Sequence, residues 1–186
     1  DQAKLQACRK ELADGLLKDI KSGEHMFALF FHYDADGMCA AKMLEMFLRM
    51  YCGTTGDKLT VEFYNARSSS DPQIVSKKNE GYKTIVVDLN LDENSRGIDA
   101  VFDHHEKTDA VDSELIKRNN PGITVITPRV MGMKDFYGHD ADPQRRWNTC
   151  GNILRPLIKK VLGAFRGQKF DLRYGWLAGV SLVSEG

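Results

Sequence analysis

Acidic and histidine side chains gather at three points of the sequence, and each point directly follows a short apolar run. The three groups are His32-Tyr33-Asp34-Ala35-Asp36-Gly37, Asp88, and Asp103-His104-His105. In an open α/β sheet, ligands bind beyond the carboxyl ends of the strands, so side chains at these positions meet at one edge. Carboxylates and imidazoles crowded there repel one another and lose hydration unless cations compensate them. The pattern therefore predicts a metal site.

The kinds of ligand narrow the choice of metal. Carboxylates favour hard divalent ions such as Mg²⁺ and Mn²⁺, and imidazole shifts the preference toward Mn²⁺. The three groups contain no cysteine, which argues against a structural zinc site. They hold more ligands than one ion needs, so we predict two ions about 3.5–4 Å apart, bridged by one carboxylate and a water. Such a pair activates the water for in-line hydrolysis of a phosphoester or phosphoanhydride, without a covalent enzyme intermediate.

Taken singly, the three groups differ in how strongly they indicate metal binding. A D-x-D-G turn after a strand is common because Asp and Gly are frequent turn formers, and a lone Asp88 at a strand end is more often a cap or turn residue. Three ionisable residues directly after an apolar strand, Asp103 to His105, are harder to explain structurally. The order and spacing of all three groups favour metal chemistry.

The elements that must position these groups alternate between strands and helices. Apolar and β-branched runs predict strands at 26–31, 59–64, 84–87, 98–102 and 123–126. Helical spacing predicts helices at 5–20, 38–51 (closed by Gly53), 148–165 and 171–184, and Asp71 and Pro72 can cap a short helix up to Gly81. We therefore expect an α/β fold with a mostly parallel sheet flanked by helices on both faces, and a single domain over 1–186.

Composition limits the class of protein. The 186 residues are 42% hydrophobic with a formal net charge of zero, and they contain no apolar run long enough for a membrane span. No signal peptide is visible, and the four cysteines form no CxxC pair. We expect a cytoplasmic protein with reduced cysteines and no membrane partner. The start without Met and the stop after an apolar helical stretch suggest a fragment of a longer protein.

Two segments are candidates for contact with substrate. Residues 144–173 carry eight basic residues against one acidic residue, and such a block either attracts a polyanion or forms a solvated helix face. The candidate substrate-binding residues are Arg145, Arg146, Lys159 and Lys160. The irregular run 128–146 is typical of a functional loop. Arg67 with Ser68 to Ser70 is expected to form a solvated loop, with phosphate contact as the alternative.

The three chemical groups resemble the first three motifs of the DHH (RecJ-like) phosphoesterase superfamily. The H-x-D-x-D-G form of the first group is that of archaeal RecJ-like proteins, and the third group is the tripeptide for which the superfamily is named. The resemblance covers roughly 28–186, and 148–152 resembles the start of the helix that follows in the family. It implies a DHH-type N-terminal catalytic domain without the C-terminal substrate-binding domain of the family.

The resemblance also implies a role for each motif residue. The implied metal ligands are His32, Asp34, Asp36, Asp88 and His104. Asp34 and Asp36 each bind one metal and Asp88 bridges both. His104 binds the second metal, and His32 binds or lies near the first.

Two residues are expected to act in catalysis. Asp103 orients a histidine, and His105 contacts the scissile phosphate or supports the bridging water. The family's fourth motif, an Asp that completes the second metal site, has no counterpart at 175–186. Glu185 is the possible substitute.

The function implied is that of a phosphodiesterase dependent on Mn²⁺ or Mg²⁺, with two ions, acting as an exonuclease on single-stranded DNA or RNA. The alternative substrates are small: oligonucleotides, cyclic dinucleotides, nucleoside bisphosphates or pyrophosphate. A non-catalytic replication scaffold of the same fold is the other alternative, which the missing fourth Asp favours and the retained ligands oppose. The expected partners are single-stranded nucleic acid and replication or repair proteins.

Overall fold

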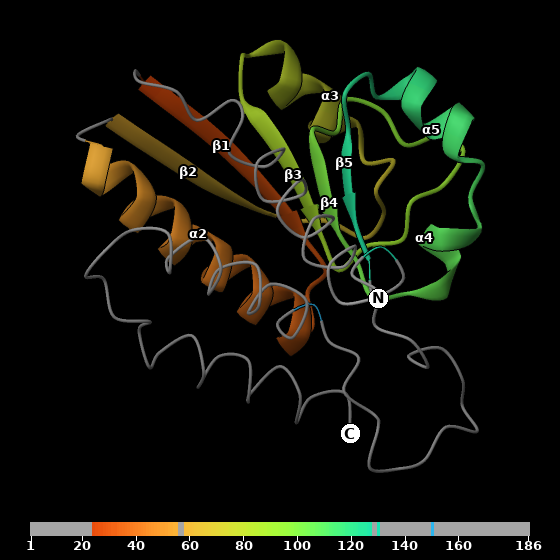
Figure 1. The fold of residues 1–186 in the computed structure, drawn as a ribbon, viewed down its shortest axis with the longest axis horizontal. Coiled ribbons are helices and arrows are strands. Elements are labelled where there is room, and N and C mark those ends of the chain that lie inside the picture. The colour runs from red at the N-terminus through yellow and green to blue at the C-terminus, as the bar shows by residue number, and fades with distance from the viewer. Residues whose placement is uncertain (1–23, 56–57, 128–129, 131–149, 151–186) are drawn as a thin grey trace, which may run out of the picture.

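The computed structural model describes residues 24–55, 58–127, 130 and 150. These residues contain one sheet of five parallel strands in the order β2-β1-β3-β4-β5 (Figure 1). The strands are β1 (Glu24–Phe31), β2 (Lys58–Asn65), β3 (Lys83–Val87), β4 (Ala100–Phe102) and β5 (Thr124–Ile126). The helices are α2 (Ala35–Thr55), α3 (Pro72–Asn79), α4 (Glu106–Ala110) and α5 (Ser113–Asn119). The predicted α/β class with a parallel sheet is confirmed.

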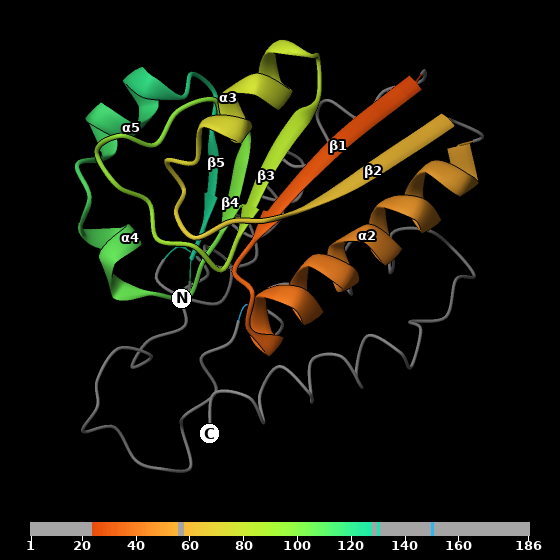
Figure 2. The same cartoon turned by 180° about the vertical axis from the view of Figure 1, so that it is seen from behind.

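Helices cover both faces of this sheet. Because successive side chains of a strand point to opposite faces, each strand supplies two layers of core. Ala28 and Phe30 of β1 belong to a buried cluster with Ile74 of α3 and Ile116 of α5, so these two helices pack on one face. Helix α2 lies on the other side of the sheet in both views (Figures 1 and 2), and its Phe47 is buried. The expected flanking by helices on both faces is confirmed.

The apolar sequence of the central strand β3 is explained by its burial on both faces of the sheet. Thr84 to Val87 are all buried, as expected of a parallel strand covered on both faces. The Thr84 hydroxyl is compensated there by hydrogen bonds to Asp99 and to the Gly97 carbonyl. This strand ends directly at Asp88, so the most buried part of the fold leads into the candidate site.

The boundaries of several elements differ from those expected. Helix α2 continues to Thr55, so the predicted end at Gly53 is wrong, and β4 begins at Ala100 rather than at residue 98. The short helices α4 and α5 were not predicted. The side chain of Asp112 caps α5 by accepting hydrogen bonds from the backbone N–H groups of Glu114 and Leu115, 2.9 and 3.4 Å away. That cap was the available local signal.

Some of the sequence predictions fall on parts of the chain outside the described residues. These are the helices at 5–20, 148–165 and 171–184 apart from residue 150, the loop at 128–146 apart from residue 130, and Arg145, Arg146, Lys159, Lys160 and Glu185. In the described ranges, no helix combines the length and apolar character that a membrane span requires.

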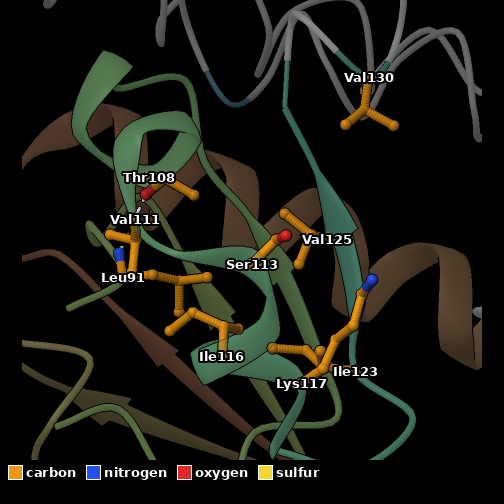
Figure 3. Close-up of a pocket in the computed structure, with 9 residues that line it drawn as sticks. All are labelled: Leu91, Thr108, Val111, Ser113, Ile116, Lys117, Ile123, Val125 and Val130. Atoms are coloured by element: carbon orange, nitrogen blue, oxygen red, sulfur yellow. Dashed lines mark hydrogen bonds between the residues drawn. The ribbon is translucent and has the colours of Figure 1, made fainter. Parts of the chain in front are cut away.

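A mostly apolar pocket of about 330 Å³ lies beside α4, α5 and β5 (Figure 3). Its walls include Leu91, Ile116 and Val125, and Thr108 adds a hydroxyl. That hydroxyl accepts a hydrogen bond from the Leu91 N–H at 2.9 Å. Apart from Lys117, the lining residues that the structure describes are uncharged, and none of them is a carboxylate, histidine or cysteine that could bind a metal. Thr108 connects the pocket to the site described next.

Candidate metal centre

The register of the parallel strands brings the three chemical groups to one edge. Phe31 pairs with Val87, Val87 with Phe102, and Phe102 with Ile126, so these strand ends are level. The backbone hydrogen bonds continue one residue further, because the Asp88 N–H donates to the Phe102 carbonyl at 2.8 Å. The residues after β1, β3 and β4 therefore emerge side by side, as the sequence predicted.

The first group forms a tight turn into α2. The Asp34 carboxylate accepts a hydrogen bond from the Gly37 N–H at 2.9 Å, and its other oxygen lies 2.5 Å from His32 Nδ1. Burial opposes ionisation of Asp34, but these hydrogen bonds outweigh it and lower its pKa. A Cβ on Gly37 would come within 2.4 Å of the His32 carbonyl oxygen. Only glycine therefore fits this turn. The turn brings His32 and Asp34 together beside Asp88.

Asp88 occupies a conformation that few side chains adopt. Its φ of 59° lies in the left-handed region, which is strained for a residue other than glycine and is often retained for function. The residue is 2% exposed. Burial, reinforced by the negative charge of Asp36, raises the pKa of Asp88 to about 6. The fold thus holds a carboxylate where ionisation is unfavourable without a nearby cation.

His104 is the imidazole that faces these carboxylates. Its Nε2 lies 3.1 Å from an Asp88 oxygen and 3.6 Å from an Asp36 oxygen. Burial opposes its protonation, but the contact with Asp88 and the charges of Asp36 and Asp103 outweigh burial and raise its pKa to about 9. Without a metal ion, protonated His104 thus supplies the positive charge that compensates two buried carboxylates, Asp36 and Asp88.

Asp103 makes its side-chain contacts with His105 and Thr108. One oxygen lies 2.6 Å from His105 Nδ1, and the other accepts a hydrogen bond from the Thr108 hydroxyl. The hydrogen bond to Asp103 raises the pKa of His105. Asp103 is fully buried while the His105 side chain is 40% exposed. Asp103 is therefore hydrogen-bonded to His105, whose ring reaches solvent, and its role in orienting a histidine stays a prediction.

Cys150 also lies in the site, although the sequence motifs gave it no role. Its backbone N–H donates to an Asp36 oxygen at 2.8 Å, and its Sγ lies 3.5 Å from an Asp88 oxygen. Burial, together with the negative charges of Asp88 and Asp36, raises the pKa of the thiol well above its ordinary value. The expected set of oxygen and nitrogen ligands thus gains a sulfur neighbour. The contact joins residues far apart in sequence, so no local pattern shows it.

The donor atoms form three overlapping groups that can hold a metal ion. The groups are Asp36, Asp88, His104 and Cys150; His32, Asp34 and Asp88; and Asp88, Asp103 and His105. In each group the donor atoms lie within 4.8 Å of one another. Asp88 belongs to all three. The structure therefore brings together every residue that the motifs singled out as metal ligand or catalytic group, while the role of each stays a prediction.

No protein-family model matches the chain, and no curated protein matches it. Among solved structures it is similar to CDC45 from Entamoeba histolytica, with a TM-score of 0.53 and 14% sequence identity. The match covers 98% of this chain and 33% of that chain, so this chain spans about a third of the length of CDC45. At this identity the likeness shows the fold alone.

Proposed function

We propose that this protein hydrolyses phosphodiester bonds with Mn²⁺ or Mg²⁺ and acts as a RecJ-like exonuclease on single-stranded nucleic acid. The observation that carries the proposal is the sharing of Asp88 between the group with Asp34 and the group with Asp36. A carboxylate common to two donor groups is placed to contact both ions of a two-metal site.

The donors fit a pair of divalent cations. Asp36 and Asp88 are almost completely buried, and buried carboxylates this close are stable only when positive charge compensates them. Carboxylate and imidazole donors suit Mn²⁺, and Mg²⁺ less well. When bound, the two ions supply an activated water and neutralise the oxygens of the phosphate. His32 and Asp34 would hold one ion, Asp36 and His104 the other, and Asp88 both.

The remaining residues position the substrate and its protons. Because Asp103 holds Nδ1 of His105, the other ring nitrogen is the one available to a ligand. The raised pKa of His105 increases its protonated fraction at neutral pH, so the ring can donate a hydrogen bond to a phosphate oxygen. His105 also lines a cavity together with His32 and Asp88. A phosphate placed in this cavity would contact the metal donors and His105 at the same time.

The likeness to CDC45 shows fold and does not separate an enzyme from a non-catalytic scaffold. The test is release of nucleotides from a labelled single-stranded oligomer by the whole chain with Mn²⁺. We expect release by the wild-type protein and its loss in Asp36→Asn, because Asp36 is fully buried among the donors. Asp112→Asn, which makes the same change at the exposed cap of α5, is the control.

Each alternative function has its own outcome in this assay. Hydrolysis of dinucleotides, nucleoside bisphosphates or pyrophosphate, without release from the oligomer, would move the proposal to the small-substrate class. Mn²⁺ binding without hydrolysis of any of these substrates would favour the scaffold.

A further inference from the structure

The apolar pocket of about 330 Å³ beside α4, α5 and β5 continues the core of the fold. Its lining residues Leu91 and Ile116 belong to the buried cluster on this face of the sheet, and Val111, Ile123 and Val125 pack against that cluster. Figure 3 shows these side chains around the pocket. An apolar group that entered the pocket would therefore leave water and contact the core, which favours binding.

Two polar side chains of α5 also line this pocket. Ser113 and Lys117 are both exposed, and they lie four positions apart in α5, so they share one face of the helix. Lys117 is the one charged residue among the described residues that line the pocket. A molecule with an apolar body and an anionic group could contact the apolar walls and Lys117 together.

Lys117 has an ion-pair partner, Glu114, but this pair is easily replaced. The Lys117 Nζ lies 3.0 Å from a Glu114 oxygen, and the two side chains are 64% and 79% exposed. Ion pairs this exposed contribute little to stability, because water screens the charges and the side chains lose freedom. The carboxylate of a ligand can therefore take the place of Glu114 at little cost.

The part of the pocket away from Lys117 is connected to the metal centre. Thr108 and Leu91 line the pocket on that side (Figure 3). The Thr108 hydroxyl accepts from the Leu91 N–H at 2.9 Å and donates to Asp103, whose other oxygen contacts His105. Leu91 also lines the cavity beside the metal donors. A molecule in the pocket would therefore hold in place two residues that support the metal centre.

We propose that this pocket binds a small apolar molecule with one anionic group, such as a medium-chain carboxylate, and that the bound molecule strengthens metal binding through Thr108. The apolar body lies against Ile116 and Val125, and the carboxylate lies at Lys117 and Ser113. The volume of the pocket is at the lower end of the range for small-molecule sites, which suits a short chain. The site is separate from the proposed active site, and binding to it requires no hydrolysis.

Calorimetry of the whole chain with hexanoate, heptanoate, octanoate and octan-1-ol tests the site. We expect saturable binding, with an affinity that rises about fourfold for each CH₂ that the pocket buries. Octanoate should bind about threefold more tightly than octan-1-ol, because its carboxylate pairs with Lys117 in an exposed position. Absence of saturable octanoate binding, or equal affinity for octanoate and octan-1-ol, would overturn the proposal.

Four variants test the location of the site. Lys117→Gln should remove the threefold preference for octanoate, and Glu114→Gln, which frees Lys117 from its partner, should increase it. Arg118→Gln removes a charge from the next residue of α5, which does not line the pocket, and should change neither affinity. Val125→Trp fills the pocket and should abolish binding of both molecules, with circular dichroism to check its fold. Equal effects of Lys117→Gln and Arg118→Gln, or full binding by a folded Val125→Trp, would contradict the proposal.

Mn²⁺ affinity with and without saturating octanoate tests the coupling to the metal centre. We expect octanoate to raise Mn²⁺ affinity about fivefold, and Mn²⁺ to raise octanoate affinity by the same factor. Thr108→Ser retains the hydroxyl and should keep this factor, whereas Thr108→Val should lose it and still bind octanoate. An unchanged Mn²⁺ affinity, or a factor retained in Thr108→Val, would overturn the role of Thr108. Absence of Mn²⁺ binding would refute the coupling and the proposed function, while octanoate binding would still support the site.

Discussion

Replacing Asp88 with asparagine tests the metal centre through protein stability. Asn keeps the shape of the side chain and removes the charge that all three donor groups share. We expect Asp88→Asn to stabilise the metal-free protein and, at the same time, to abolish stabilisation by Mn²⁺. The mutation is thus expected to raise stability without metal and to lower it relative to wild type with Mn²⁺. This change of sign is expected of a residue that serves ligand binding and destabilises the unliganded fold.

The size of the first effect follows from the pKa of Asp88, which rises from 3.8 to about 6 on folding. A tenfold change in proton affinity corresponds to about 1.4 kcal/mol, so keeping Asp88 ionised opposes folding by about 3 kcal/mol at neutral pH. This penalty is absent below the unfolded pKa, grows as pH rises from 3.8 to about 6, and is complete above that range. For a chain of this size, recovering about 3 kcal/mol raises the melting temperature by about 6–12 °C.

The assay is thermal unfolding of the wild-type protein and Asp88→Asn, with chelator and with Mn²⁺, at neutral pH and near pH 4. Asp112→Asn is the control, because Asn caps a helix about as well as Asp does. It should leave all four melting temperatures unchanged. With chelator, the difference between Asp88→Asn and wild type should shrink toward zero near pH 4. A lower melting temperature of metal-free Asp88→Asn, or an undiminished Mn²⁺ effect in it, would refute the reasoning.

Three further predictions concern the turn, the histidine and the thiol. Gly37→Ala should lower the unfolding free energy by about 1–3 kcal/mol and weaken Mn²⁺ binding, because its Cβ would meet the His32 carbonyl; an unchanged denaturant midpoint would contradict this. Since the pKa of metal-free His104 is about 9, a metal must displace its proton. Mn²⁺ affinity measured by calorimetry should therefore rise about tenfold per pH unit through the neutral range. A pH-independent affinity would show that His104 is not a metal ligand. Cys150→Ser should weaken Cd²⁺ binding more than Mn²⁺ binding, because a thiol favours the softer ion; equal effects on both ions would show that Sγ is not a ligand.

The parts of the fold that the sequence predicted are those with strong local patterns. Thr84 to Val87 is a β-branched run, so its burial as a central strand follows from composition alone. The convergence of Asp88 with His104 was predictable as well, because parallel strands end at one edge of the sheet. Helices α4 and α5 have five and seven residues, too short to show a periodic apolar pattern.

The parts that could not be predicted depend on contacts between distant residues. Cys150 reaches Asp88 across 62 positions of sequence, and nothing in its neighbourhood marks it as part of a metal centre. Arg67 lies in a serine-rich loop that is polar enough to be only solvated. Its place in a cavity with His105 depends on the hydrogen bonds that join this loop to Asp92. Local composition carries no information about such contacts between residues distant in sequence.

Electron paramagnetic resonance during a Mn²⁺ titration tests the central claim, a pair of ions that share Asp88, most directly. We predict that the wild-type chain binds about two ions and that the spectrum of the second shows magnetic coupling to the first. Asp88→Asn should show no coupled pair. Failure to bind Mn²⁺, or binding of ions that remain magnetically independent, would contradict the account.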